Sequence, residues 1–215
     1  MLNIDSVWAV PIASEDSNFV LTKKEKDSLL TLKTEEGSNI GSITENKRIL
    51  DIKEFKRVRE FFFKVVEQYK NEVWHINNPL HLLHSWATFQ SKGNYHSSHY
   101  HPHAIISMTY YPQCENGELR LTKDKHALQE NFEFYYDLSQ HNKFNAPCWK
   151  LPVKTGTLVI FPGWLRHTTV AYPSKSLRIC MAANFFIDGQ FQRDGDALSL
   201  LDIECKSGGL LKSNG

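Results

Sequence analysis

The sequence lacks several features that mark common classes of protein. It has no excess charge of one sign, since 25 Lys and Arg residues stand against 24 Asp and Glu residues, and the basic residues are spread along the chain. This balance argues against a nucleic acid or a membrane surface as a partner. No apolar run approaches the length of a transmembrane helix, and the first residues lack the basic and apolar segments of a signal peptide.

Cysteine is also scarce. The four cysteines are Cys114, Cys148, Cys180 and Cys205, and none of them forms a CxxC pair. Such wide spacing is typical of isolated thiols in a reducing compartment, so we expect a cytoplasmic protein. The chain has no internal repeat and no low-complexity segment, and its length of 215 residues indicates a single domain.

One long helix and a series of strands are predicted. Between Asp51 and Tyr69, apolar residues recur at the spacing of an amphipathic helix, with charged residues between them. After Trp74, short segments rich in β-branched and aromatic residues are separated by Gly, Pro, Asn and Ser. These segments are "LHLLHSWATFQ", "AIISMTYY", "GELRLT", "GTLVIFP" and "SLRICMAANFFI". The order predicts a mainly β fold of the α+β class, a sandwich or small barrel with helices packed outside.

Four of the ten histidines lie within "NYHSSHYHPH", from Asn94 to His103. His99 and His101 have the i, i+2 spacing that puts two side chains on one face of a strand. A metal site with open positions needs a third protein ligand. His167 is the candidate, because it follows directly after the strand in "GTLVIFPGWLRHTTV". The remaining histidines are interpreted as structural or solvent-facing: His75, His81, His84, His96, His103, His126 and His141.

These motifs occur in the order found in a known family. The segments "GNYHSSHYHPHAIISMTYYP", "NGELRLTKD" and "GTLVIFPGWLRHTTVAYPSKSLRICMAANF" resemble the Fe(II)/2-oxoglutarate-dependent oxygenases. The resemblance is greatest with the small HxHP branch of phages and marine bacteria, and prolyl hydroxylases are more distant relatives. It implies a double-stranded β-helix (jelly roll) with N-terminal supporting helices. We therefore expect one oxygenase domain over 1–205, with helical support over about 1–75, a jelly-roll core over about 80–190 and a disordered tail over 206–215.

The resemblance also implies a site and its cofactors. The metal ligands of the family fall on His99, His101 and His167, which would bind Fe(II). The arginine that holds the far carboxylate of 2-oxoglutarate falls on Arg178. Tyr111 matches the tyrosine that hydrogen-bonds the same carboxylate in the prolyl hydroxylase-like branch. The implied reaction uses O2, hydroxylates a small molecule or a peptide, and releases succinate and CO2.

The position of Arg178 supports its role independently of the resemblance. It interrupts the apolar strand "SLRICMAANF", where an unpaired charge would be costly. A guanidinium keeps its charge in a dry interior and donates two parallel hydrogen bonds, which suits a carboxylate ligand. An ion pair with a carboxylate of the protein itself is the alternative role.

His101 departs from the usual pattern, because most of the superfamily has a carboxylate at this position. Three neutral imidazoles leave the charge of the metal uncompensated, and imidazole also suits Zn, Cu and Ni. Three-histidine iron sites occur in cupin-type dioxygenases that do not use 2-oxoglutarate, and the spacing from Gly93 to His99 fits the start of the first cupin motif. The Glu and Asn of the cupin motifs are missing here. A non-catalytic, metal-stabilised jelly-roll module is the third alternative.

The sequence leaves the substrate open. The segment from Asn131 to Pro152 lies where the family carries insertions over the mouth of the site, and it is interpreted either as an aromatic lid or as a flap that covers the sheet. Its aromatic residues are Phe132, Phe134, Tyr135, Tyr136, Phe144 and Trp149. Tyr95 and Trp164 lie beside candidate ligands in the sequence and are open to a substrate role or a packing role.

Overall fold

The computed structural model describes residues 9–123, 139–187, 203–204 and 212–213. Its helices are α1 (Lys23–Leu30) and α2 (Lys56–Trp74), and the short 3-10 helices η1 (Ile49–Asp51) and η2 (Lys53–Phe55) precede α2. The strands are β1 (Ala13–Asp16), β2 (Thr34–Gly37), β3 (Gly41–Thr44), β4 (Leu80–Gln90), β5 (Ile106–Gln113), β6 (Gly117–Thr122), β7 (Cys148–Val153), β8 (Thr157–Pro162), β9 (Arg166–Thr169), β10 (Arg178–Ile187), β11 (Ile203–Glu204) and β12 (Lys212–Ser213). No helix among the described residues is long and apolar enough to cross a membrane.

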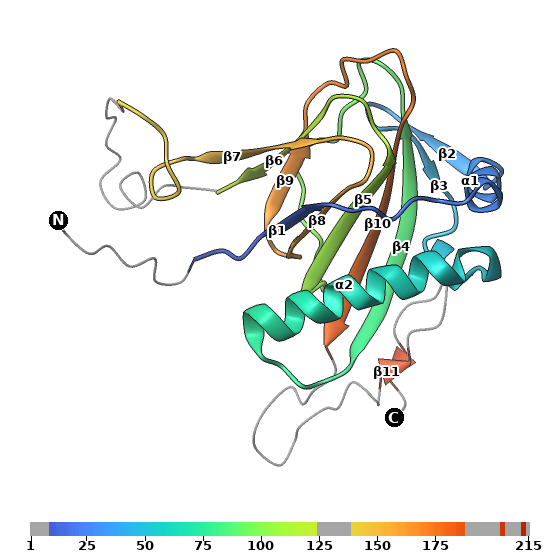
Figure 1. The fold of residues 1–215 in the computed structure, drawn as a ribbon, viewed down its shortest axis with the longest axis horizontal. Helices are drawn as coiled ribbons and strands as arrows, with labels where there is room; N and C mark the ends of the chain where they lie inside the picture. The colour runs from blue at the N-terminus through green and yellow to red at the C-terminus, as the bar shows by residue number, and fades with distance from the viewer. Residues whose placement is uncertain (1–8, 124–138, 188–202, 205–211, 214–215) are drawn as a thin grey trace.

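Two antiparallel sheets form the body of the protein (Figure 1). The large sheet has the strand order β1-β8-β5-β10-β4-β3-β2, and the small sheet has the order β7-β6-β9. The chain before β5 extends the small sheet, because His99 forms an antiparallel bridge with His167 of β9. This architecture is the predicted jelly roll, a mainly β fold with few helices.

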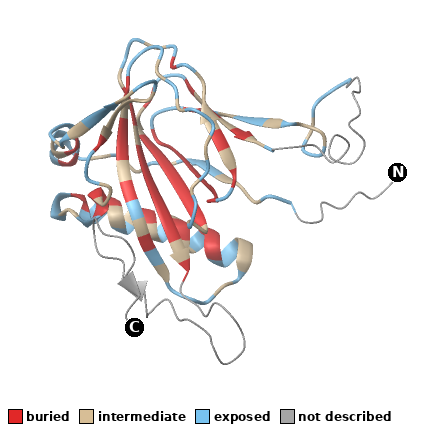
Figure 2. Ribbon diagram, turned by 180° about the vertical axis from the view of Figure 1, so that it is seen from behind, coloured by how far each residue is buried: buried red, intermediate tan, exposed pale blue. Residues whose placement is uncertain are grey.

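One face of the large sheet packs on α2, which lies across it (Figure 1). The buried side of the helix carries Val58, Phe62, Val66 and Tyr69, at the spacing that the sequence predicts. From the sheet, the same core receives Ala87, Met108, Tyr110, Leu158, Ile160, Ile179, Met181, Ala183 and Phe185. Figure 2 shows the buried residues concentrated along these central strands and on the helix. This core is the main source of apolar burial in the fold.

The opposite face of the large sheet looks into the space between the two sheets. A second, smaller core lies there, and it joins Tyr111, Val159 and Phe161 of the large sheet to Leu119 and Leu121 of the small one. Side chains alternate between the faces of a strand, so the neighbours of the helix-facing residues point into this space. It is here that the predicted site residues are found.

The N-terminal part, predicted to be a helical support, also contributes strands to the large sheet. β1 pairs with β8, and β2 and β3 form a hairpin whose second strand pairs with β4. The hairpin turn ends at Gly41, which has a φ of +78°. A Cβ at this position would lie 2.3 Å from the carbonyl oxygen of Phe89, so a side chain does not fit there. The tail expected to be disordered, 206–215, lies outside the described residues except for β12, which pairs with β11.

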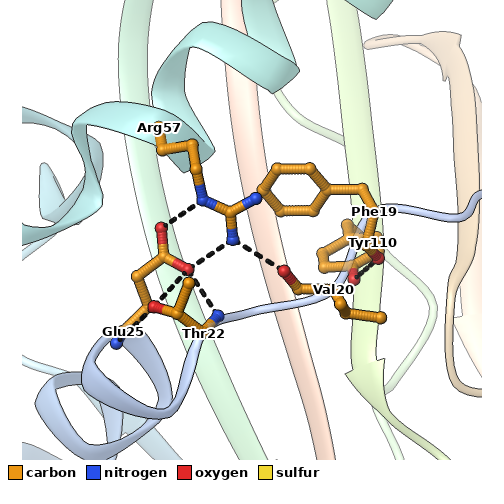
Figure 3. Close-up of polar contacts among 6 residues, drawn as sticks. All are labelled: Phe19, Val20, Thr22, Glu25, Arg57 and Tyr110. Carbon is orange, nitrogen blue, oxygen red and sulfur yellow. Dashed lines mark hydrogen bonds and ion pairs between the residues drawn. The ribbon is translucent and has the colours of Figure 1, made fainter.

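A polar contact ties the N-terminal segment to α2 (Figure 3). The Arg57 guanidinium donates to both carboxylate oxygens of Glu25, at 2.9 and 2.5 Å, and to the carbonyl of Val20. Glu25 also closes the capping box at the start of α1 by accepting from the backbone N–H of Thr22. Arg57 lies over the ring of Phe19 at 4.2 Å. These contacts position α1 against the long helix.

Candidate metal and cosubstrate site

The three candidate metal ligands lie on two segments that are hydrogen-bonded side by side. His99 and His167 face each other and exchange both backbone hydrogen bonds, with N to O distances of 3.0 and 2.9 Å. Residues paired in this way project their side chains to the same face, and His101, two residues along, projects there as well. The ligand atoms of the three histidines all lie within 4.8 Å of one another. With metal–nitrogen bonds of about 2 Å, this is close to the span that one ion bridges.

A glycine makes the close approach of the two segments possible. The backbone N–H of His101 donates to the carbonyl of Gly163 at 2.9 Å, and the N–H of Gly163 donates to the carbonyl of Ile105 at 3.0 Å. A Cβ at position 163 would lie 2.2 Å from the carbonyl oxygen of Ala104. Any other residue would therefore push the loop between β8 and β9 away from His101.

Backbone hydrogen bonds orient two of the imidazoles. His99 Nδ1 lies 2.8 Å from the carbonyl oxygen of Ser97, and His167 Nδ1 lies 2.9 Å from that of Leu165. A carbonyl only accepts, so Nδ1 carries the proton in both rings and Nε2 keeps its lone pair. Such a bond is the usual outer support of a metal-binding histidine. His101 has no such bond within the described residues, and its ring packs against Trp86 at 5.4 Å between centroids.

The environment keeps these imidazoles uncharged. Burial lowers the pKa of His101 to about 3, and the neighbouring His99 lowers it further. Burial likewise lowers the pKa of His167 to about 3, again with a contribution from His99. The pKa of His99 itself is also lowered by burial. Near neutral pH, all three rings offer a lone pair, which is the form that binds a metal ion.

Arg178 is fully buried beside this cluster. It donates to the side-chain oxygen of Gln90 through Nε at 2.9 Å and through Nη2 at 2.5 Å, and to the hydroxyl of Thr169 at 3.1 Å. Thr169 is two residues after His167 on β9, so the two side chains share a face. The ring of Tyr172 lies 4.9 Å from the guanidinium carbon. No carboxylate of the described residues pairs with Arg178, and its Nη1 has no hydrogen-bond partner among them.

Tyr111 lies on the same inner face and is 2% exposed. Burial, followed by the nearby Cys180 thiol, raises the pKa of Tyr111 well above its ordinary value, so the ring stays a neutral phenol. Within the described residues, no hydrogen bond joins it to Arg178 or to the three histidines. A shared role with Arg178 in binding a carboxylate stays a prediction.

The other histidines lie outside the cluster of three. The ring of His96 stacks on that of His99, with centroids 3.9 Å apart, and burial lowers its pKa to about 4. His103 lies exposed in the turn after His101. His126 is outside the described residues. The remaining histidines are exposed, namely His75, His81, His84 and His141.

The aromatic segment is described only in part. Phe132, Phe134, Tyr135 and Tyr136 lie outside the described residues. Trp149 lies on β7 and is 46% exposed. It pairs with Leu121, which in turn pairs with His167, so these three side chains point to one face of the small sheet. Tyr95 and Trp164 are exposed.

Several residues of the site were not predicted from the sequence. Gln90, Thr169 and Tyr172 surround Arg178, and His96 stacks on a candidate ligand. Their residue types are ordinary in strands and loops, so no motif singles them out. Only the alternation of side chains along a strand could have indicated Gln90: Trp86, Thr88 and Gln90 are every second residue of β4 and so share a face. Alternation assigns Gln90 to a face of the sheet but does not identify the residue that it contacts.

Comparison with known proteins identifies a superfamily and a fold. Residues 84–184 match a family described as "Putative 2OG-Fe(II) oxygenase". This core of the chain belongs to the 2OG-Fe(II) oxygenase superfamily. The oxygenase core is thereby placed among the oxidoreductases, and the family's cofactors are the predicted Fe(II), 2-oxoglutarate and O2. The narrower likeness to the HxHP branch stays a prediction.

Solved structures with the same fold have low sequence identity. HygX from Streptomyces hygroscopicus, with nickel and 2-oxoglutarate bound, is 14% identical with a TM-score of 0.55, over 82% of this chain and 83% of that one. The α-ketoglutarate-dependent epimerase SnoN from nogalamycin biosynthesis is 12% identical with a TM-score of 0.55, over 76% and 69%. The carbocyclase SnoK of the same biosynthesis is 12% identical with a TM-score of 0.55, over 82% and 80%. No curated protein matches the sequence.

Proposed function

We propose that this protein is an Fe(II)- and 2-oxoglutarate-dependent hydroxylase of a small organic molecule. One observation carries the proposal: a three-histidine cluster and a buried arginine, which has no anionic partner among the described residues, face the same interior. Thr169 links them, because it accepts from Arg178 and shares a strand face with His167. A non-catalytic module stabilised by a metal would need the histidines but not the arginine.

The histidines would hold the metal. His99, His101 and His167 provide three neutral nitrogen ligands, which is the number typical of metal sites that keep positions open for other molecules. The hydrogen bonds from Nδ1 of His99 and His167 to backbone carbonyls hold Nε2 of both rings in place. The donor set therefore fits a divalent transition metal.

Arg178 would hold the cosubstrate. Alternate residues on a strand lie about 7 Å apart, so the step from His167 to Thr169 separates the imidazole cluster from the guanidinium by a length comparable to that of a five-carbon dicarboxylate. A 2-oxo acid of this length that is bound at the metal would bring its second carboxylate to the guanidinium, whose free N–H can donate to it. The free Nη1 of Arg178 is thus the feature that fits 2-oxoglutarate.

When bound, Fe(II) and 2-oxoglutarate supply the activation of O2 that is coupled to loss of CO2, formation of succinate and hydroxylation of the substrate. The protein itself would bind and orient the metal, the cosubstrate and the substrate, and would exclude water from the site. Phe161 packs against the ring of His167 at 4.7 Å and Trp86 against that of His101 at 5.4 Å, so apolar rings shield the imidazoles.

A small organic molecule is the substrate class that the comparisons favour over a peptide. HygX has been crystallised with hygromycin B bound, at 13% identity and a TM-score of 0.54 to this chain. SnoN and SnoK act in nogalamycin biosynthesis. The row that runs from the buried His167 and Leu121 to the exposed Trp149 would lie along the path by which such a molecule enters.

The test is an anaerobic titration of the Fe(II)-loaded protein with 2-oxoglutarate, followed by addition of O2. We expect the visible charge-transfer band of a 2-oxo acid chelated to Fe(II), and then slow formation of succinate without substrate. Absence of the band together with oxidation of cysteine-like thiols would favour the cupin-type alternative. Metal binding with neither reaction would favour the non-catalytic module.

A further inference from the structure

Gln90 holds the buried arginine in an unusual way. The last residue of β4, Gln90, lies opposite the first residue of β10, Arg178, and both side chains are buried, with 3% and 0% exposed. The amide oxygen of Gln90 accepts from Nε and Nη2 of Arg178 at once. Because a guanidinium only donates, the amide must present its oxygen, and its nitrogen faces away. Neither Gln90 Nε2 nor Arg178 Nη1 has a partner among the described residues.

This arrangement fixes the guanidinium without neutralising it. A glutamate in place of Gln90 would make the same two hydrogen bonds and would also cancel the charge. With the neutral amide, two N–H groups of the buried guanidinium are satisfied while its positive charge stays uncompensated. The pair therefore leaves one charged donor and one neutral donor free in the interior, which are complementary to a carboxylate.

We infer that Gln90 is a specificity-determining residue of the cosubstrate site, an inference that rests on the proposed function. Its amide oxygen holds the Arg178 guanidinium in one orientation and keeps it available for an anion. The two residues together make binding depend on a carboxylate at the far end of the 2-oxo acid, which excludes 2-oxo acids that have only one carboxylate.

The test compares two ligands on the Fe(II)-loaded protein without O2, by calorimetric titration. 2-Oxoglutarate has the distal carboxylate, whereas 2-oxobutyrate has the same chelating end and lacks it. In Gln90→Glu the new carboxylate pairs with Arg178, so affinity for 2-oxoglutarate should fall roughly tenfold to a hundredfold. Affinity for Fe(II) and for 2-oxobutyrate should not change. If Gln90 served only in packing, its substitution would lower the affinity for both ligands equally or for neither.

Gln113→Glu is the matched control. Gln113 lies on the neighbouring strand β5, pairs with Ile179 on the helix-facing side, and bonds Lys26 and the carbonyl of Leu177. The same substitution there adds the same charge nearby without reaching Arg178, so 2-oxoglutarate binding should stay at the parent value. Equal losses in both variants would attribute the effect to general electrostatics and overturn the inference.

A second variant covers the case in which Gln90→Glu does not fold, as judged by its thermal unfolding. Gln90→Asn keeps the amide but shortens it, so the oxygen no longer reaches both guanidinium nitrogens, and the loss should again affect 2-oxoglutarate alone. If the parent binds 2-oxoglutarate and a folded Gln90 variant binds it equally well, the inference is wrong and the proposed function stands. If the parent binds no 2-oxoglutarate, the proposed function itself fails.

Discussion

At the scale of single residues, the site combines a positive charge with neutral ligands, and no acidic side chain in the described part of the chain pairs with them. The three imidazoles add no negative charge, and Arg178 is bonded to an amide and a hydroxyl. A divalent metal and a guanidinium in one buried space favour a dianionic ligand. With the proposed ligands, this chain would depend on its cosubstrate for charge balance more than a relative with an aspartate ligand would.

Alanine substitutions should divide the histidines into two groups. Loss of His99, His101 or His167 leaves two imidazoles, so Fe(II) should dissociate readily from each variant. His96→Ala is the control, since His96 stacks on His99 but lies outside the cluster, and it should retain the metal. Iron titration of the apo-proteins measures this. Retention of iron by His101→Ala together with its loss from His96→Ala would mean that the ligands are assigned wrongly.

His101→Asp should behave differently from His101→Ala. The carboxylate restores the commoner His/Asp/His set at the same strand position and adds a negative charge beside the metal. We expect it to keep iron and some conversion of 2-oxoglutarate to succinate, both of which His101→Ala should lose. If the two variants lose the metal equally, the backbone at position 101 does not direct a short side chain to the metal.

At the scale of elements, the contact between α1 and α2 depends on a charged group. Burial alone would raise the pKa of Glu25, but hydrogen bonds from Arg57 and Thr22 outweigh it and hold the pKa below its ordinary value. Glu25 is 5% exposed, whereas the Arg57 side chain is 45% exposed, so solvent screening weakens the ion pair. The capping box of α1 shares the same carboxylate.

Glu25→Gln should lower the free energy of unfolding by about 1–3 kcal/mol at neutral pH, since it removes charged hydrogen bonds and weakens the cap. Because the folded pKa lies below the unfolded one, the contribution of the charge is fully present above the unfolded value of about 4.5. It is lost as the pH falls through the folded pKa. The difference between parent and variant should therefore shrink in acid.

Denaturant unfolding at several pH values measures this difference. Glu60→Gln is the control, because the only ion pair of Glu60 with a residue that the structure describes is an exposed one with Lys56 on α2, at 3.9 Å. Its unfolding free energy should match that of the parent throughout. A pH-independent loss in Glu25→Gln would show that the carboxylate acts by packing and not by charge.

At the scale of the whole molecule, the fold has two apolar cores, one on each face of the large sheet. The core between the large sheet and α2 contains most of the buried apolar residues, whereas the space between the sheets combines a smaller core with the polar site. The ligands of the site would thus add stability where apolar packing supplies less of it.

Ligand binding should therefore raise the unfolding temperature in two separable steps. Ni(II), a redox-inert stand-in for iron, should give the first increase, and 2-oxoglutarate the second. At a hundredfold excess over the dissociation constant, each step should amount to about 5–10 °C for a chain of this size. Arg178→Ala should keep the first step and lose the second, as measured by thermal unfolding. A second step of full size in this variant would make the arginine structural.

Much of this protein is determined locally by its sequence. The spacing from Val58 to Tyr69 specifies the helix and its buried side, because periodicity is a short-range property of the chain. The i, i+2 spacing of His99 and His101 specifies a shared face for the same reason. The order of the strands predicted a mainly β sandwich or barrel, and the resemblance of the motifs to a known family implied the jelly roll and the superfamily.

Tertiary structure decided which residues surround these local features. Gln90 meets Arg178 across 88 residues of sequence, and His99 meets His167 only because the chain before β5 pairs with β9. The register of two strands depends on the loops and packing around them, not on their own residues. The sequence therefore determined the type of each candidate ligand and the face it occupies. Only the folded chain brought the ligands together and left Arg178 with a neutral partner.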